Sequence, residues 1–386
     1  MNIVFLSPHF PPNFWHFCRG LREAGATPLG IADAPWEALR PELRAVLAEY
    51  YRVPDLHRHE DLVRGLGYLT FRHGQIDRLD SLSEYWLETE ARLRDDFNIP
   101  GLRTADMAGI KRKSAMKGLF VQAGIAVARG RICPTPESVR SFVSEVGYPV
   151  VAKPDMGVGA AQTWKLESDR EVDAYLAAKP PVDYILEEFV SGPIVTYDGL
   201  ADRAGRIVFD ASLEFDRGIM DVVNEDADMS YTAIRDIAPD LAEAGRRVAE
   251  TFGVRERFFH FEFFRKADGG LVALEVNVRP PGGRTVDMWN YQNDIDIYRE
   301  WGNLLVRGRV ECAAARSHFV TWVGRKDRLH YAWTAGQLRA RFGSMIVTHE
   351  RVEDIFARAI GNEGFILRSP DLEPLVEATA AIRQKA

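Results

Sequence analysis

Two runs of residues, 258–266 and 271–279, constrain the fold most because their polarity alternates on both sides of a Gly269-Gly270 turn. Successive side chains of a strand point to opposite faces, so sustained alternation predicts two extended strands. A short connection with two glycines joins such strands as an antiparallel hairpin. The chain therefore needs an antiparallel sheet in this region, with one apolar and one polar face.

The polar face of this hairpin presents oxygen donors. Glu275 and Asn277 share a face with Arg279, and Glu262 lies on the neighbouring strand. Two carboxylates and an amide oxygen are ligands that Mg²⁺ takes when water and phosphate fill its other positions. Arg279 suits a phosphate or an acyl phosphate. The alternative is a solvated polar face, but Glu262 and the following turn, Pro280–Gly283, favour a metal site.

Two upstream lysines are candidate phosphate contacts. Lys153 ends the apolar strand 150–154, where an ammonium is costly to bury unless it meets an anion. Lys113 lies on a basic helix predicted over 104–123, and taken alone it is better explained as a surface lysine. Small residues follow Lys153, and they would let backbone N–H groups approach a phosphate. They are Gly157, Gly159 and Ala160.

A further candidate element is the end of the strand predicted over 184–190. Its last four residues are Glu187, Glu188, Phe189 and Val190. Such a strand entering a turn could offer backbone groups to an adenine edge, and a carboxylate to the adenine amino group or to ribose. An edge strand with exposed acids explains the same residues equally well in isolation.

The order of these elements resembles the ATP-grasp superfamily over about residues 104–308, and the 275–283 stretch is similar to the carboxylate–amine (amino-acid) ligase branch. The resemblance implies that Lys113 and Lys153 contact ATP phosphates, that the glycine loop closes over them, and that residues 187–190 line the adenine pocket. It implies Mg²⁺, with Mn²⁺ as an alternative ion, held by Glu262, Glu275 and Asn277.

On the substrate side, the resemblance implies that Arg279 faces the acyl phosphate. Arg284 could pair with a carboxylate of an amino-acid-like substrate, or it could be an ordinary loop salt bridge. Two positions depart from the family pattern. Ile194 stands where an acid usually contacts ribose, with Asp198 as a substitute, and the long loop 216–231, which could close the site, offers only Arg217 where a lysine is common.

The expected fold class is α/β, with α+β character in the nucleotide-binding part. Residues 3–32 alternate strand, helix and strand, which predicts a Rossmann-like parallel α/β domain at the N-terminus. The resemblance implies an ATP-grasp fold of two α+β subdomains after it. The expected boundaries are 1–100 for the N-terminal domain, 101–190 for the subdomain with the lysines and glycine loop, 191–311 for the subdomain with the metal site, and 312–386 for a C-terminal α/β extension that packs on the core.

Composition limits the class of protein further. The net charge of −7 argues against a nucleic-acid binder. Three scattered cysteines, Cys18, Cys133 and Cys312, suggest neither a disulfide framework nor a zinc site. The apolar start lacks a basic leader, and no apolar run reaches the length of about 18 residues that a membrane span needs. We therefore expect a cytoplasmic protein without membrane partners.

The resemblance implies an enzyme that joins a small-molecule carboxylate to an amine through an acyl phosphate. Related enzymes often form dimers, so a homodimer is an expectation. Two alternatives stay open from the sequence. One is an ATP-grasp phosphotransferase or carboxylase that acts on another acceptor. The other is a nucleotide-binding protein without turnover, against which the complete set Glu262, Glu275 and Asn277 weighs.

Overall fold

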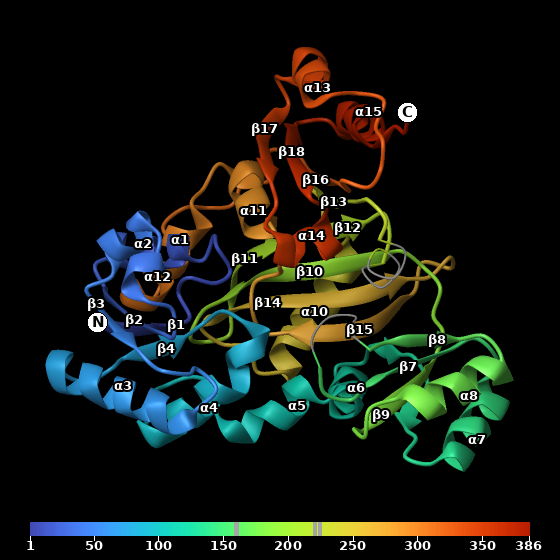
Figure 1. Cartoon of the computed structure of the whole chain (residues 1–386), viewed down its shortest axis with the longest axis horizontal. Coiled ribbons are helices and arrows are strands. Elements are labelled where there is room, and N and C mark those ends of the chain that lie inside the picture. Colours follow the sequence, from blue (N-terminus) through green and yellow to red (C-terminus); the bar gives the residue numbers. More distant parts are fainter. Residues whose placement is uncertain (158–161, 219–221, 223–225) are drawn as a thin grey trace.

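The structure is a computed structural model that describes residues 1–157, 162–218, 222 and 226–386. Within these ranges the strands form three sheets (Figure 1). The N-terminal sheet is parallel, in the order β3-β2-β1-β4, as the strand–helix–strand opening predicts. Its strands are β1 (Asn2–Leu6), β2 (Thr27–Ala32), β3 (Glu49–Arg52) and β4 (Arg78–Asp80), and its helices are α1 (Trp15–Glu23), α2 (Pro41–Val46), α3 (His59–His73) and α4 (Leu87–Asp96).

The largest sheet has ten strands and runs through the middle of the molecule. Its order is β17-β18-β16-β13-β12-β10-β14-β15-β5, with β11 also paired to β10. The strands are β5 (Ala126–Val127), β10 (Ile194–Ala201), β11 (Ile207–Ala211), β12 (Leu213–Phe215), β13 (Met229–Ala233), β14 (Arg257–Arg265), β15 (Leu271–Asn277), β16 (Phe319–Arg325), β17 (Ile346–Arg351) and β18 (Glu363–Ser369). The predicted hairpin is confirmed, because β14 and β15 pair antiparallel.

A third, four-stranded sheet has the order β6-β9-β7-β8 and lies beside β15 in Figure 1. It consists of β6 (Gly130–Ile132), β7 (Val150–Pro154), β8 (Trp164–Leu166) and β9 (Tyr184–Glu188), with α7 (Pro136–Val146) and α8 (Asp169–Ala178). Its apolar side chains form a hydrophobic cluster of their own.

The helix predicted over 104–123 is interrupted. It consists of α5 (Met107–Lys111) and α6 (Lys113–Gln122), with Arg112 in an extended conformation between them. Both helices pack in the hydrophobic cluster of the ten-stranded sheet together with α10 (Pro239–Thr251), whereas the four-stranded sheet packs separately. Lys113 therefore comes from the body of the large sheet, although the expected boundaries group its helix with residues 130–190.

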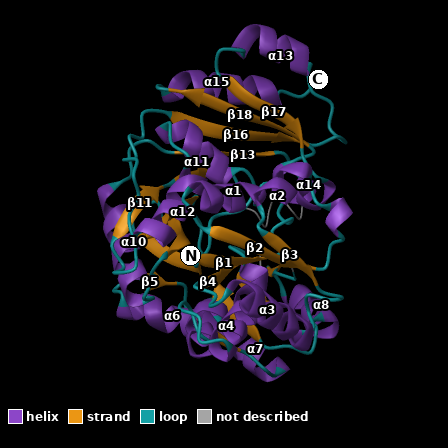
Figure 2. Cartoon of the chain, turned by 90° about the vertical axis from the view of Figure 1, so that its left-hand side faces the viewer, coloured by secondary structure: helices purple, strands orange, loops and turns teal. Residues whose placement is uncertain are grey.

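The C-terminal residues extend the large sheet. Strands β16, β17 and β18 lie at one end of the molecule in Figures 1 and 2, together with α13 (Ala335–Phe342) and α15 (Leu372–Arg383). Helix α14 (Asp354–Ile360) lies nearer the centre in Figure 1. Two further helices, α11 (Thr285–Asn293) and α12 (Ile297–Arg307), follow β15. In the described ranges, no helix combines the length and apolarity of a bilayer span.

Helix α12 packs against α1 of the N-terminal part at a pair of glycines. A side chain at Gly20 would meet the backbone oxygen of Tyr298 at 2.3 Å, and one at Gly302 would meet the oxygen of Gly20 at 2.5 Å. The two backbones therefore approach closely only because both positions lack a Cβ atom. This contact attaches the N-terminal sheet to the segment that follows the β14–β15 hairpin.

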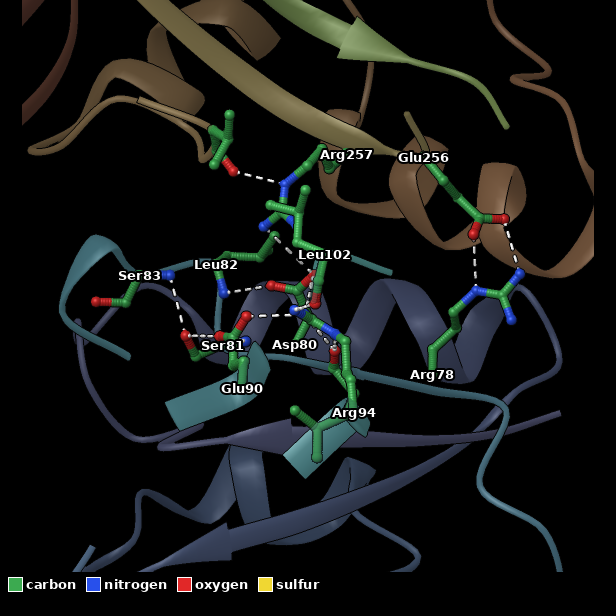
Figure 3. A network of polar contacts seen from close by, with 12 residues as sticks. Arg78, Asp80, Ser81, Leu82, Ser83, Glu90, Arg94, Leu102, Glu256 and Arg257 are labelled. Carbon is green, nitrogen blue, oxygen red and sulfur yellow. Dashed lines mark hydrogen bonds and ion pairs between the residues drawn. The ribbon is translucent and has the colours of Figure 1, made fainter. Parts of the chain in front are cut away.

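A second attachment is a set of four charged side chains, here called the boundary cluster: the buried Glu90, Arg94 and Arg257 and the partly buried Asp80 (Figure 3). Arg94 Nη2 donates to Glu90 Oε2 at 2.8 Å, and Arg257 Nη2 lies 3.8 Å from Asp80 Oδ2. Arg257 belongs to β14, and its Nε donates to the backbone oxygen of Val278 at 2.7 Å. The cluster thereby joins β4 and α4 to the end of β15.

Candidate functional site

A cavity of about 920 Å³ receives residues from both the ten-stranded and the four-stranded sheet. Lys153 of β7 and Glu187 of β9 line it from one side, and Glu262, Glu275 and Asn277 of β14 and β15 line it from the other. Its volume is near the upper end of the range of about 300–1,000 Å³ that is usual for ligand pockets. Residues that the sequence analysis selected from distant segments are therefore brought together here.

Two lysines and one glutamate form a charged group at the edge of the cavity, here called the cavity cluster: Lys153 and Glu187, which line the cavity, and Lys117, which pairs with Glu187. Lys117 Nζ lies 2.6 Å from Glu187 Oε1, and Lys153 Nζ lies 2.6 Å from Glu187 Oε2. Burial opposes ionisation of Glu187, but the charges of Lys153 and Lys117 outweigh it and hold the pKa of Glu187 below its usual value. Positive charge exceeds negative charge within this trio.

Lys113 is positioned by the break before α6. Asp155, at the end of β7, accepts the backbone N–H of Ser114 on Oδ1 at 2.8 Å and that of Lys113 on its backbone oxygen at 2.9 Å. A carboxylate at a helix N-terminus satisfies otherwise unpaired N–H groups and complements the helix dipole. Lys113 Nζ then forms an ion pair with Glu275 Oε1 at 3.2 Å in the lining of the cavity.

The oxygen donors of the hairpin are direct neighbours. Glu262 pairs with Glu275, and His260 pairs with Asn277, across β14 and β15. The expected alternation is wrong at one position, because a bulge follows the Glu262–Glu275 pair and leaves Leu274 without a partner in the register. A bulge puts two consecutive residues on one side of a strand. Leu274 therefore lines the cavity together with Glu275, although alternation placed it on the opposite face.

A buried histidine connects Glu262 to a second carboxylate. His260 Nε2 lies 2.9 Å from Glu262 Oε1, and His260 Nδ1 lies 2.7 Å from Asp198 Oδ1. Burial alone would lower the pKa of His260, but Asp198 and Glu262 raise it to about 9, so the imidazolium donates to both carboxylates at neutral pH. Thr196 donates to the other oxygen of Asp198 at 2.7 Å. This row fixes the orientation of Glu262.

Comparison with known proteins by sequence finds two kinds of related enzyme. No protein-family model matches the chain. It is 25% identical over 248 residues to an L-arginine-specific L-amino acid ligase of Bacillus subtilis, covering 59% of each chain. It is 26% identical over 296 residues to the carbamoyl phosphate synthase large chain of Corynebacterium glutamicum, which is 68% of this chain but 25% of that relative. The chain thus spans less than two thirds of either relative.

Solved structures match nearly the whole chain. The L-amino acid ligase from Bacillus licheniformis has a TM-score of 0.73 at 13% identity, over 98% of this chain and 95% of that one. The N5-carboxyaminoimidazole ribonucleotide synthetase from Thermotoga maritima has a TM-score of 0.71 at 16% identity, over 99% and 97%. The chain has the ATP-grasp fold. At these identities the solved structures establish the fold alone.

Most of the predicted site residues line the cavity. They are Lys113, Lys153, Gly157, Glu187, Glu188, Phe189, Val190, Glu262, Glu275, Asn277 and Arg279. Gly159 and Ala160 lie outside the described residues, as do residues 219–221 and 223–225 of the loop 216–231. Glu188 is paired with Arg129, whose Nε lies 2.6 Å from Glu188 Oε2.

The two arginines after the hairpin occupy different places. Arg279 lines the large cavity, and its Nη2 lies 3.3 Å from Asn277 Oδ1. Arg284 instead lines a smaller cavity of about 410 Å³ and donates to both oxygens of Glu350, at 2.6 and 3.0 Å. Its guanidinium already has a carboxylate partner within the protein, so its contact with a substrate stays a prediction.

Three residues of the site were missed or assigned differently from the sequence. Lys117 has the same charge as Lys113 and follows it by one helical turn, which was the available signal. His260 shares the polar face of Glu262, but only the register places Asp198 opposite it. Asp198 is fully buried between Thr196 and His260, so its carboxylate is engaged there rather than at ribose.

Proposed function

We propose that this ATP-grasp protein is an ATP-dependent carboxylate–amine ligase with an amino-acid-like substrate. The observation that supports it is that Lys113 and Lys153 line the same cavity as the oxygen donors Glu262, Glu275 and Asn277, with Lys113 paired to Glu275. Cationic side chains beside hard oxygen ligands are what phosphoryl transfer requires. Similarity to amino acid ligases in sequence and fold supports the choice of reaction.

The oxygen donors fit a Mg²⁺ ion that also binds nucleotide phosphates. Over the described residues, no group of three His, Cys, Asp or Glu side chains forms a complete metal site. Glu262, Glu275 and Asn277 instead supply two adjacent carboxylates and one amide, which suits Mg²⁺ because it keeps water and phosphate ligands. When bound, the ion would neutralise charge on the transferring phosphoryl group.

The protein's own residues position the reactants. Lys113 and Lys153 would contact the ATP phosphates, and Arg279 would face the acyl phosphate. In the first step a carboxylate oxygen bonds to the γ-phosphorus as the bond to the β–γ bridging oxygen breaks and ADP leaves. In the second step the amine nitrogen bonds to the acyl carbon, phosphate leaves, and the nitrogen loses a proton. The residues contribute charge and orientation rather than a nucleophile.

The test is ATP-dependent phosphate release with a panel of amino acids and amines, followed by mass spectrometry of the products. An amide together with ADP and phosphate is the expected result. A stable phosphorylated product, or turnover with bicarbonate alone, would replace the proposal with a phosphotransferase or a carboxylase. Nucleotide binding without release for any acceptor would indicate a non-catalytic protein.

A Glu275→Gln variant tests the site itself. Losing one charged oxygen donor should lower kcat by about 10²–10³-fold, which is the usual cost of removing a preorganised group that stabilises the transition state. The variant should keep its fold, because Gln has the same shape and Glu275 is not deeply buried. Wild-type turnover in Glu275→Gln would exclude the assignment of the metal site.

A further inference from the structure

The cavity continues beyond the nucleotide and metal residues along the ten-stranded sheet. This continuation, here called the apolar chamber, lies against β12, β13 and α14. It is lined by Phe215, Met229, Tyr231, Phe356, Ala359 and Ile360. In the strand order β13-β12-β10-β14, three strand spacings separate β13 from β14, which places the far wall about 14 Å from the strand of Glu262.

The walls of the apolar chamber are packed aromatic and aliphatic side chains. The rings of Phe215 and Tyr231 stack with centroids 5.2 Å apart, and Phe10 stacks on Phe356 at 5.8 Å. Met229 and Ile360 are buried. Since these side chains are in place, the chamber is a preformed apolar pocket, and such pockets bind the apolar part of a ligand.

A glycine keeps the passage between Arg279 and the apolar chamber open. Gly283 has a φ of +65°, and a Cβ atom there would lie 3.1 Å from Tyr231 Oη and 3.6 Å from Ile360 Cδ1. Any side chain at this position would therefore narrow the space between Tyr231 and Ile360. A molecule whose reacting group meets Arg279 can extend past Gly283 into the chamber.

The hydroxyl of Tyr231 lies at this passage. The side chain is 3% exposed, and Oη makes no hydrogen bond of normal geometry to any residue in the described ranges, although the side chain of Thr285 and the backbone of Arg284 lie near it. Burial raises the pKa of Tyr231 to about 12, so the group keeps its proton at neutral pH. The hydroxyl proton therefore has no well-placed acceptor within the described residues, and an oxygen atom of a ligand can accept it.

We propose that the apolar chamber binds an apolar side chain of the carboxylate substrate, and that Tyr231 Oη donates a hydrogen bond to an oxygen of the same molecule. The substrate is then an amino-acid-like acid with a long hydrocarbon side chain. This inference rests on the proposed ligase function, because that function places the reacting carboxylate beside Arg279.

A series of acids of increasing chain length tests the inference. Glycine, alanine, 2-aminobutyrate, norvaline and norleucine are compared in ATP-dependent phosphate release at a fixed amine concentration, with aspartate and lysine as polar acids. Each methylene that enters the chamber is worth about 0.8 kcal/mol, so kcat/KM should rise about fourfold per methylene. The KM for ATP should stay constant. Equal kcat/KM for norleucine, aspartate and lysine would overturn the inference.

Binding measurements separate this inference from the proposed function. The same acids are titrated calorimetrically into the full chain with a non-hydrolysable ATP analogue present. If no acid supports phosphate release, the ligase function fails, but tighter binding of norleucine than of glycine still supports the apolar chamber. If release occurs and binding does not increase with chain length, the chamber assignment fails and the ligase function stands.

Two variants and one matched control locate the effect. Ala359→Leu adds bulk inside the chamber and should lower kcat/KM for norleucine about tenfold or more while sparing alanine. Ile355→Ala is the control, because Ile355 lies on the same helix and is 68% exposed. Tyr231→Phe removes only the hydroxyl and should raise the KM of the acid about 2- to 12-fold. Identical profiles for Ala359→Leu and Ile355→Ala, with Tyr231→Phe unchanged, would contradict the inference.

Discussion

The boundary cluster and the cavity cluster both bury charged side chains, but they differ in what surrounds the charges. In the boundary cluster two carboxyl groups and two guanidinium groups lie together, and Arg94 donates to Glu90 (Figure 3). Arg94 also donates to the backbone oxygen of Leu79. In the cavity cluster Glu187 is shared by two lysines, and Lys153 and Glu187 line the large cavity.

This difference shows that a perturbed pKa does not by itself mark a functional site. Burial and the nearby Asp80 raise the pKa of Glu90 to about 7, and burial likewise lowers the pKa of Lys117. Both clusters would be selected by that criterion. Access to a cavity and an excess of one sign of charge distinguish the cavity cluster, and these two properties match a phosphate ligand.

The largest expected effect is on stability, in the boundary cluster. Arg94→Leu leaves Glu90 buried without its cation, so the free energy of unfolding should fall by about 3–5 kcal/mol. Urea unfolding measures this change, and nucleotide titration of the folded protein at low temperature should give wild-type affinity. Arg92→Leu, an exposed arginine on the same helix, is the control and should stay within about 0.5 kcal/mol. A loss of nucleotide affinity in Arg94→Leu would erase the distinction between the clusters.

For Lys153 the expected effect is on nucleotide affinity instead. Lys153→Met removes a proposed phosphate contact but leaves Glu187 paired with Lys117. Affinity for a non-hydrolysable ATP analogue should fall about 10- to 100-fold, as is usual when a hydrogen bond to a charged group is lost. Calorimetric titration measures it, and the exposed Lys266→Met is the control. Unchanged affinity would remove Lys153 from the phosphate site.

The sequence was informative where chemistry and local periodicity coincide. Alternation on both sides of Gly269-Gly270 predicted the β14–β15 hairpin, and the residue types Glu262, Glu275 and Asn277 predicted its oxygen donors. The bulge at Leu274 could not be predicted, because no residue type in the sequence marks it. It nevertheless puts Leu274 on the same side of β15 as Glu275.

Features that depend on contacts between distant segments could not be predicted from the sequence either. At the break at Arg112, the start of α6 donates a hydrogen bond to Asp155, which follows β7 and is distant in the sequence. The walls of the apolar chamber come from β12, β13 and α14, which are ordinary apolar segments in the sequence. Only the strand order β13-β12-β10-β14 places them beside the oxygen donors.

A smaller effect is expected from the titration of Glu90. An unfolded glutamate loses its proton near pH 4.5, whereas folded Glu90 keeps it until about pH 7 because burial and Asp80 disfavour the charge. Between these values the folded state binds more protons than the unfolded state, so the free energy of unfolding should fall as pH rises from about 5 to 7. Glu90→Gln should abolish this contribution, which the difference between the urea-unfolding curves of the two proteins measures. Parallel pH profiles would contradict the assigned shift.

The smallest effect is expected at Glu188, the sequence neighbour of Glu187. Glu188 is partly exposed and pairs with Arg129, and such pairs contribute about 0–1 kcal/mol. Glu188→Gln should therefore change stability by no more than this and change nucleotide affinity less than about threefold.

Glu187→Gln, one residue earlier, leaves Lys117 and Lys153 buried without their carboxylate, which should cost stability and alter nucleotide affinity together. Measuring both variants by urea unfolding and calorimetry compares an exposed acid with a buried one on the same strand. If both variants changed stability and nucleotide affinity equally, burial between the two lysines would not be what distinguishes Glu187 from Glu188.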